Sequence, residues 1–292
     1  MYHSHMTAQA KNDSLNAEQT FVAFDTETTG VWAPAHRLVE IGAIKFRLGD
    51  NTVQQFQSLI QPERSIPGEV IEIHGITDDM VAASPTAETV LDQFMTFCGQ
   101  DSVLIAHNVT FDISFLACEL ERYGKSFGNN LFLDTLDICQ RVFPDLESYS
   151  LLSLAQHFNL ASSQEHRALG DASLVHLLFM LAAEHSTIPF TPHNLESHFA
   201  VYHAHDWRDE QRPVPDQYTP LLTAIDNAGR VKIAYQHRSL GDQWRVVRPI
   251  GIYSLGSRFY LHAFCEKVQA ERTFRLDRVS AFEILPEETP EN

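Results

Sequence analysis

Residues 20–30 read TFVAFDTETTG, and this stretch decides the fold of the first part of the chain. The apolar run from 21 to 24 is typical of a buried central strand. Asp25 and Glu27 follow it, and because alternate residues of a strand project to the same face, both carboxylates point one way. Acidic pairs at this spacing are common at solvated strand ends and are weak evidence for a site. This pair lies beside a core, however, where it needs a cation or strong partners.

The chain beyond this stretch alternates strand and helix patterns up to residue 186. Strands are predicted over 21–24, 38–46, 54–60, 103–106 and 131–133, and helices over 85–97, 111–123, 150–158 and 169–185. Together these patterns predict an α/β domain with a mixed sheet over residues 20–186. Residues 1–19 are polar and are expected to be a flexible leader.

Composition changes after residue 186. Residues 187–218 are rich in proline and polar residues, which indicates a linker. Four histidines in it are irregularly spaced and lack a nearby cysteine, which favours ordinary linker histidines over a metal site: His193, His198, His203 and His205.

A second domain is predicted over residues 219–285, and an acidic tail over 286–292. Its predicted helix spans 220–227, and its predicted strands span 231–235, 244–247, 259–264 and 273–276. Strands this short and closely spaced indicate a small antiparallel barrel.

The net charge of −17 is unevenly distributed along the chain. Residues 1–218 hold 11 lysine and arginine residues against 29 aspartate and glutamate residues, a net charge of −18, whereas residues 219–285 hold 10 against 6, a net charge of +4. An acidic domain is poorly suited to gripping long duplex nucleic acid, so we expect it to engage a strand end. The basic part is the better candidate for an anionic ligand, although such a charge is also common on an ordinary solvated surface.

Other features argue against membrane, secreted and disulfide-rich proteins. The longest apolar segment, 174–183, is too short to cross a bilayer, and residues 1–19 do not resemble a secretion signal. We therefore expect a cytoplasmic protein. The four cysteines are scattered without the spacing of a zinc site or a disulfide framework, and are expected to be reduced and mostly buried.

Two further motifs carry candidate catalytic residues. Residues 107–112 read HNVTFD and lie where the strand 103–106 passes into a helix, so Asp112 falls in the first turn of that helix. Asp112 and Asn108 are also residue types that cap helices, and this alternative stays open.

Residues 166–172 read HRALGDA and open the last helix of the first domain. Positions five apart on a helix are separated by about 140°, so His166 and Asp171 meet at one site only if His166 lies before the regular helix. The alanines and the glycine of this motif would let the helix approach a strand closely. The alternative is an amphipathic helix with an incidental histidine.

Four acids from two strand ends and two helices can therefore converge: Asp25, Glu27, Asp112 and Asp171. Two carboxylates about 4 Å apart repel by about 4 kcal/mol at an effective dielectric near 20, so converging acids need divalent cations. Hard oxygen ligands without a thiolate select Mg²⁺ or Mn²⁺. Two such ions can activate a water and stabilise the leaving 3′ oxygen of a phosphodiester. His166 is the candidate general base, because histidine ordinarily titrates near working pH.

These three motifs, in this order, resemble those of the DEDDh exonuclease family, which includes the epsilon proofreading subunit of bacterial DNA polymerase III and ribonuclease T. The resemblance covers residues 20–186, and residues 74–77 (HGIT) look like its epsilon-type branch. It implies a ribonuclease H-like fold with two Mg²⁺ or Mn²⁺ ions.

The resemblance also implies a role for each residue of these motifs. Asp25 would bridge both ions, Glu27 and Asp171 would hold the first, and Asp112 would support the second. His166 would position and deprotonate the water. The backbone of Thr28 would contact the terminal nucleotide, and the further substrate-binding candidates are His107 and Asn108.

Residues 219–285 resemble a WYL domain, a small SH3-like barrel named for a Trp-Tyr-Leu signature. Here residues 259–261 read FYL, a departure at the first position, whereas 245–249 (RVVRP) and 272–278 (RTFRLDR) fit well. Such domains are associated with sensing nucleic acid or nucleotides through basic and aromatic residues. The implied candidates are Tyr235, Arg245, Tyr260, Arg275 and Arg278. Several of them could instead hold the barrel together.

The sequence thus predicts a metal-dependent 3′–5′ exonuclease acting on the 3′ ends of single-stranded nucleic acid, DNA in preference to RNA, with a WYL domain that binds nucleic acid or a nucleotide ligand. One alternative is a 3′–5′ exoribonuclease, since no residue reveals the 2′-hydroxyl contacts that distinguish RNA. Another is a non-catalytic, ligand-responsive regulator that binds nucleic acid, although binding alone gains nothing from clustered acids. Roles in DNA repair, RNA processing and defence are equally open.

Overall fold

The computed structural model describes residues 19–164, 166–204, 213–237, 241–255 and 258–286. The chain divides into two compact units, Met1–Arg208 and Asp209–Asn292. The predicted leader and acidic tail lie almost wholly outside the described residues. Within the described residues, no helix is long and apolar enough to cross a membrane. All four cysteines are buried and none forms a disulfide, as the sequence predicts.

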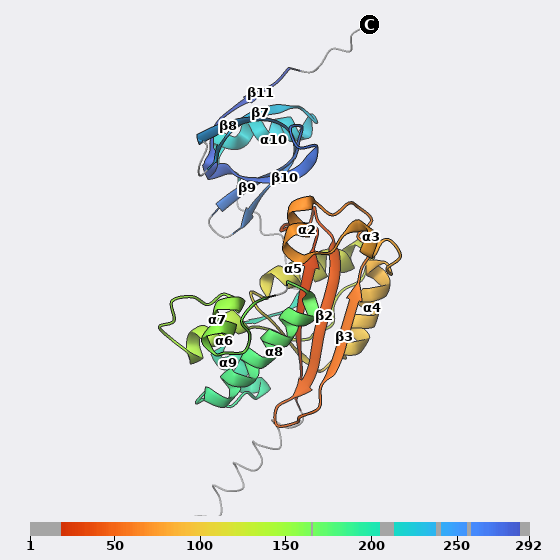
Figure 1. The fold of residues 1–292 in the computed structure, drawn as a ribbon, viewed down its shortest axis with the longest axis vertical. Helices are drawn as coiled ribbons and strands as arrows, with labels where there is room; N and C mark the ends of the chain where they lie inside the picture. Colours follow the sequence, from red (N-terminus) through yellow and green to blue (C-terminus); the bar gives the residue numbers. More distant parts are fainter. Residues whose placement is uncertain (1–18, 165, 205–212, 238–240, 256–257, 287–292) are drawn as a thin grey trace, which may run out of the picture. The chain divides into compact units, whose positions relative to one another are not determined.

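A six-stranded mixed sheet forms the centre of the first unit, in the order β3-β2-β1-β4-β5-β6 (Figure 1). Its strands are β1 (Thr20–Thr28), β2 (Leu38–Arg47), β3 (Gln54–Leu59), β4 (Val103–Ala106), β5 (Phe132–Asp134) and β6 (Val201–Tyr202). β4 is parallel to both β1 and β5, whereas β2, β3 and β6 are antiparallel to their neighbours. The predicted α/β class with a mixed sheet is confirmed.

Helices cover both faces of this sheet (Figure 1). They are α2 (Gly68–His74), α3 (Asp78–Val81), α4 (Ala87–Cys98), α5 (Thr110–Arg122), α6 (Thr135–Val142), α7 (Leu151–His157), α8 (Ala168–His185) and α9 (Pro192–His198). One core cluster lies between the sheet and α4 and α5, and another lies between the sheet and the helices α6 to α9.

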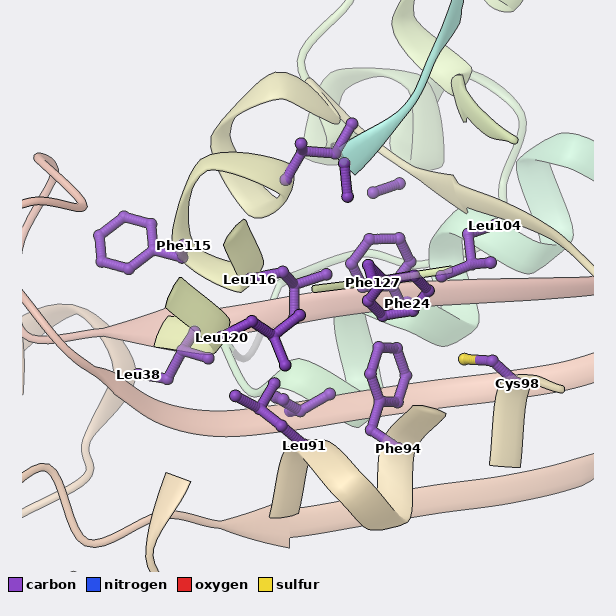
Figure 2. Packing of buried hydrophobic residues seen from close by; sticks show 14 of the residues in the cluster. Phe24, Leu38, Leu91, Phe94, Cys98, Leu104, Phe115, Leu116, Leu120 and Phe127 are labelled. Carbon is purple, nitrogen blue, oxygen red and sulfur yellow. The ribbon is translucent and has the colours of Figure 1, made fainter. Parts of the chain in front are cut away.

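β1 is buried on both faces, and its side chains alternate between the two clusters. Phe24 packs with Phe94 of α4, with ring centroids 5.7 Å apart (Figure 2). Phe21 packs on the opposite face against Phe179 of α8, with ring centroids 5.0 Å apart. The same alternation places Asp25 and Glu27 on the α8 face of the sheet.

The region predicted to be a linker, 187–218, differs from that prediction over residues 192–202. Pro192 lies in the first turn of α9, and the Thr191 side chain caps that helix by accepting from the backbone of Asn194. β6 then pairs with β5 and extends the sheet of the first unit. Proline marks a helix start here because its missing N–H group costs nothing in the first turn.

The second unit is a five-stranded antiparallel sheet in the order β10-β9-β8-β7-β11, with the helix α10 (Thr219–Asp226) packed on it. Its strands are β7 (Val231–His237), β8 (Gly241–Leu255), β9 (Arg258–Cys265), β10 (Ala270–Arg275) and β11 (Val279–Ile284). Leu221 of α10 packs in the core with Ile233 and Leu261 of the sheet.

The sheet of the second unit is not closed, so the prediction of an SH3-like barrel is wrong on this point. β10 and β11 follow each other in the chain, joined by the short 3₁₀ helix η3 (Leu276–Arg278). β10 pairs with β9 and β11 pairs with β7, which puts them at opposite ends of the strand order. Within the described part of this unit, no ladder joins the two end strands.

Candidate active site

Three carboxylates meet at the edge of β1. Asp25, Glu27 and Asp171 each offer one oxygen, and these three oxygens lie within 4.8 Å of one another. The first two residues are supplied by β1 and the third by the first turn of α8. Asp171 is 3% exposed, and the side-chain amide of Gln164 donates to its Oδ2 at 2.6 Å. The structure therefore brings together three of the four acids that the sequence singles out.

The close approach of α8 to the sheet depends on a glycine in the neighbouring strand. Gly42 of β2 pairs with Asp25, and a Cβ at Gly42 would lie 2.1 Å from the backbone nitrogen of Leu169. The helix thus packs backbone against backbone. Gly170, which the sequence suggests as part of this approach, is exposed and has nothing within 4 Å of where its Cβ would lie. That part of the prediction is wrong, because Gly170 points away from the sheet.

Asp112 borders the group of three oxygens but is not part of it. It lies in the first turn of α5, is 2% exposed, and accepts a hydrogen bond from the Thr26 hydroxyl at 2.6 Å. Thr26 alternates with Asp25 and Glu27 along β1, so it faces the α5 side of the sheet. Asp112 is nevertheless close enough to contribute the largest charge repulsion felt by Asp25. The fourth acid therefore approaches the site from the opposite face.

Burial and mutual repulsion suppress ionisation of these acids. Burial, followed by the charges of Asp112 and Glu27, raises the pKa of Asp25 well above its usual range. Burial and the charge of Asp171 raise the pKa of Glu27 to about 9. Burial raises the pKa of Asp112 to about 7, although the hydrogen bond from Thr26 opposes that shift. A divalent cation would relieve this repulsion, and the donor set of carboxylate oxygens suits Mg²⁺ or Mn²⁺.

His166 lies two residues before α8, which begins at Ala168 after the N-cap residue Arg167. His166 must lie before the regular helix if His166 and Asp171 are to meet at one site, and its position meets this requirement. The backbone of His166 is in the left-handed region, with φ 49°, which is uncommon for a residue other than glycine. His74 of α2 lies near this segment: burial lowers the pKa of His74, and the neighbouring Arg167 and His166 add to that effect.

Of the three substrate-binding candidates of the first domain, Thr28 ends β1, and His107 and Asn108 lie in the turn between β4 and α5. Thr28 is 6% exposed, and its hydroxyl donates to the Gly30 carbonyl at 2.5 Å. His107 has both ring nitrogens engaged, by the Thr135 hydroxyl at 3.0 Å and the Tyr149 carbonyl at 2.9 Å.

Asn108, the third of these candidates, shapes the turn that leads into α5. Its backbone has φ 62°, and its N–H donates to Asp134 Oδ1 at 2.8 Å. Asp134 in turn caps α6 by accepting from the backbone of Leu136. The side chains of His107 and Asp134 thus brace the turn from which Asp112 is presented.

Sequence reasoning missed one charged residue of this site. Glu40 of β2 is fully buried and is the cross-strand partner of Glu27. Its carboxylate contacts Arg167, the residue after His166. The only signal in the sequence is a single acid within the otherwise apolar first seven residues of β2, 38–44. That signal says nothing about its partner, which lies 127 residues further along the chain.

In the second unit, three of the five WYL candidates lie together. Tyr260 of β9 pairs with Arg275 of β10, and its ring stacks on Tyr253 with centroids 5.3 Å apart. The Arg275 guanidinium donates to Asp277 at 3.0 and 2.5 Å, and this interaction, together with smaller contributions from Tyr260 and Tyr235, raises the pKa of Arg275. Tyr235 is thereby placed in the same neighbourhood.

The other two WYL candidates differ in position. Arg278 of η3 lies near Asp277, whose pKa it helps to lower after the larger effect of Arg275. Arg245 lies on β8, opposite Ile233 of β7. A further arginine that the sequence analysis did not single out, Arg258, also acts on Asp277. The described candidates thus centre on β9, β10 and η3.

Comparison with known proteins agrees with this architecture. Residues 22–179 match the RNase T family model, described as exonuclease, and residues 216–284 match the WYL domain model. The epsilon subunit of DNA polymerase III from Treponema pallidum is 40% identical over 175 residues, which cover 59% of this chain and 80% of that protein. PolC-type DNA polymerase III from Halalkalibacterium halodurans is 34% identical over 168 residues, which cover 57% of this chain and 12% of the polymerase. This chain therefore matches only a small part of the PolC-type polymerases.

Solved structures share the fold at low sequence identity. Escherichia coli exonuclease I, in a zinc-bound complex with single-stranded DNA, superimposes with a TM-score of 0.54 and 16% identity over 84% of this chain and 54% of that one. A 3′-exonuclease that recognises a histone mRNA stem-loop superimposes with a TM-score of 0.51 and 13% identity over 57% of this chain and 82% of that one. With its sequence match over more than half its length, this chain belongs to the RNase T family of exonucleases and carries a WYL domain after the exonuclease domain.

Proposed function

We propose that this protein removes nucleotides from the 3′ end of single-stranded nucleic acid by metal-dependent phosphodiester hydrolysis. The observation that carries the proposal is the convergence of Asp25, Glu27 and Asp171, whose oxygens lie within 4.8 Å of one another. Holding three acids together without a cation is unfavourable, and a protein that only binds nucleic acid would gain nothing from it. Membership of the exonuclease family supports the same chemistry.

The residues present fit two divalent cations, Mg²⁺ or Mn²⁺. Asp25, between the other acids, would contact both ions, Glu27 and Asp171 would hold one, and Asp112 would support the other from the α5 side. When bound, the ions supply positive charge that stabilises the attacking and leaving oxygens of the phosphodiester. The protein contributes the fixed positions of its acids.

His166 would act as general base, with a ring nitrogen accepting a proton from the attacking water. Its location beside the first turn of α8 places it at the same end of that helix as Asp171. Thr28, His107 and Asn108 would contact the terminal nucleotide. Since the ring nitrogens of His107 are already engaged, it would do so through its turn rather than through those atoms.

We further propose that the WYL domain binds nucleic acid or a nucleotide ligand through Tyr235, Tyr260, Arg275 and Arg278, with Arg245 as an additional contact. Aromatic rings beside arginines can stack on bases and attract phosphate. The net charge of +4 over residues 219–285, within a chain of net charge −17, supports an anionic ligand at this domain. Such binding would hold the nuclease on its strand.

DNA is the preferred substrate in this proposal because the relatives that match by sequence are named as parts of DNA polymerase III. RNA is the second candidate. One structural neighbour is named for histone mRNA and another for single-stranded DNA, so the shared fold does not favour either polymer.

Digestion of end-labelled single-stranded DNA and RNA tests the proposal directly. The full chain is incubated with Mg²⁺ or Mn²⁺, beside Asp25→Ala and a double variant, Arg275→Ala with Arg278→Ala. Shortening from the 3′ end that disappears in Asp25→Ala supports the active site. Equal digestion by both proteins, or by neither, contradicts it. The double variant should bind long strands more weakly than the native protein, and its affinity should fall less steeply as salt rises, because two phosphate contacts are lost; an unchanged salt slope would contradict the role of the WYL domain.

A further inference from the structure

Glu40 occupies an unusual position for a charged residue. It lies on β2, the second strand from one edge of the exonuclease sheet, and is fully buried. Both of its carboxylate oxygens are used by donors on other elements. Arg167 donates from Nε at 3.0 Å and from Nη2 at 2.6 Å, the Ala168 N–H donates at 3.0 Å, and Gln57 Nε2 donates at 2.9 Å.

These contacts give Glu40 a role different from that of its neighbour Glu27. A buried charge is tolerated only when it is paired and hydrogen-bonded, and Glu40 meets both conditions within the protein. Glu27 has mainly like charges around it; burial and these charges raise its pKa, and the opposing charge of Arg167 is the smaller influence. Glu40 is therefore built to hold a protein segment, whereas Glu27 is built to hold a cation.

The segment that Glu40 holds is the one that carries His166. Arg167 is the N-cap residue of α8, and its side chain makes no capping hydrogen bond. Glu40 takes over that function from the adjacent strand by accepting the N–H of Ala168, the first residue of the helix. The guanidinium of Arg167 is at the same time held in a two-point fork, which fixes direction as well as distance.

His166 needs such support because of its backbone. Its φ of 49° lies in a region that residues other than glycine adopt at a cost, and such conformations persist where the surroundings impose them. The fork on Arg167 and the bond to Ala168 fix the chain on the C-terminal side of His166. A catalytic base must be held in place closely, since a displacement of about 1 Å can cost about 100-fold in rate.

We propose that Glu40 and Arg167 are positioning residues that hold His166 in its working orientation, with Glu40 serving as a helix cap supplied by another strand. This inference rests on the proposed role of His166 as general base. Neither residue contacts the reacting atoms in this proposal. Their effect on turnover passes through His166.

A double-mutant cycle tests whether the effect passes through His166. Glu40→Gln in the full chain should lower kcat about 10- to 100-fold on an end-labelled single strand and leave KM within about threefold. In a His166→Ala background, the same substitution should lower kcat less than about twofold, because the base that it positions is already gone. An equal loss in both backgrounds would overturn the proposal.

Two further variants separate positioning from charge and from general stability. Arg167→Lys keeps the positive charge but not the two-point fork. It should lower kcat by at least about half as much as Glu40→Gln does, on a logarithmic scale. Full activity in Arg167→Lys would contradict the proposal. Glu266→Gln is the matched control, since Glu266 in the second unit accepts the same two-point fork, from Arg230 at 2.8 and 2.7 Å. It should keep the kcat of the native protein.

Hydrogen exchange tests the same inference without any nuclease activity. In Glu40→Gln, the hydrogen-bonded amides of Ala168 and Asp171 should exchange at least about tenfold faster, while the amides of β1 and β4 stay unchanged. Uniform acceleration, or none, would overturn the positioning role. Faster amide exchange at the start of α8 in Glu40→Gln, in a protein that digests no strand, would contradict the proposed function. It would still support the conclusion that Glu40 fixes the segment beside His166.

Discussion

The exonuclease domain and the WYL domain carry their candidate residues in opposite electrostatic states. In the exonuclease domain, the acids Asp25, Glu27 and Asp171 cluster beside the hydrophobic core. Burial and mutual repulsion raise the pKa values of Asp25 and Glu27. In the second, Arg275 is already paired with Asp277 on a partly exposed surface. Clustered charges of one sign that repel one another need a ligand, whereas a charge in an ion pair does not. The first arrangement therefore points to a site more strongly than the second.

Glu27→Gln breaks the charge cluster and should have the largest effect. It removes a proposed ion ligand, so activity should fall by at least about 1,000-fold, as for other catalytic residues that act as a unit. The metal-free variant should melt at a higher temperature than the native protein at pH 8, because glutamine is neutral without the proton that Glu27 must take up on folding at that pH. Activity on an end-labelled strand and thermal melting in a chelator measure the two effects.

Glu88→Gln is the control for Glu27→Gln, because Glu88 is an exposed acid of the same domain and pairs with Lys125. Native activity and an unchanged melting temperature are expected. A Glu27→Gln variant that keeps native activity would remove Glu27 from the site.

Gly42→Ala should have the next largest effect, because it forces α8 away from β1. The added Cβ would lie 2.1 Å from the Leu169 nitrogen, so the helix must shift and carry Asp171 with it. We expect about 100-fold lower activity and a lower melting temperature. Gly170→Ala is the matched comparison: its Cβ meets nothing within 4 Å, and alanine stabilises a helix by about 0.5–1 kcal/mol over glycine. If the two variants behave alike, the close approach is not what sets the site.

Mg²⁺ should stabilise the native protein more at pH 8.5 than at pH 7. Folding raises the pKa of Glu27 from 4.5 to about 9, so the folded state holds a proton that the unfolded state releases. The stabilising effect of that proton is present at low pH and is lost as the pH rises through the folded pKa. A cation replaces the proton, so Mg²⁺ should raise the melting temperature by about 3–8 °C at pH 8.5 and by less at pH 7. A larger shift at pH 7 would contradict this account.

Arg275→Ala should have the smallest effect on stability. Its ion pair with Asp277 is exposed to solvent, and such pairs contribute little to stability. The melting temperature should therefore change little. If the WYL domain binds a nucleic-acid strand, the affinity of the variant for that strand should be lower. The dependence of this affinity on salt concentration should weaken by the amount that one lost phosphate contact causes. Fluorescence anisotropy with a labelled strand at several salt concentrations measures the affinity. An affinity and salt dependence equal to those of the native protein would remove Arg275 from the proposed binding surface.

Local patterns predicted much of both domains. The strand at Val103–Ala106 coincides with its predicted bounds, and the predicted helix at 169–185 differs by one residue from α8. These elements have strong apolar patterns of a single period, which local sequence reveals. The α9 helix was missed, because Pro192 reads as a linker residue until the packing of Leu195 and Phe199 is known.

The candidate site was predictable as a set of residues but not as an arrangement. The motifs name the acids and His166, since chemistry restricts which residue types can hold a divalent cation. They do not show that Asp112 approaches from the α5 side through Thr26. That detail depends on which face of β1 each helix covers, which is a property of the packed sheet.

The sequence by itself determined the α/β class of the first domain, the identity of the acids and the division into an exonuclease domain and a WYL domain. Only the tertiary structure decided how α8 reaches β1, through Gly42, and how the chain beside His166 is held, through Glu40 and Arg167. The reason is physical. Residue type and period are local properties of a chain, whereas a close backbone approach and a buried ion pair exist only after distant segments have packed together.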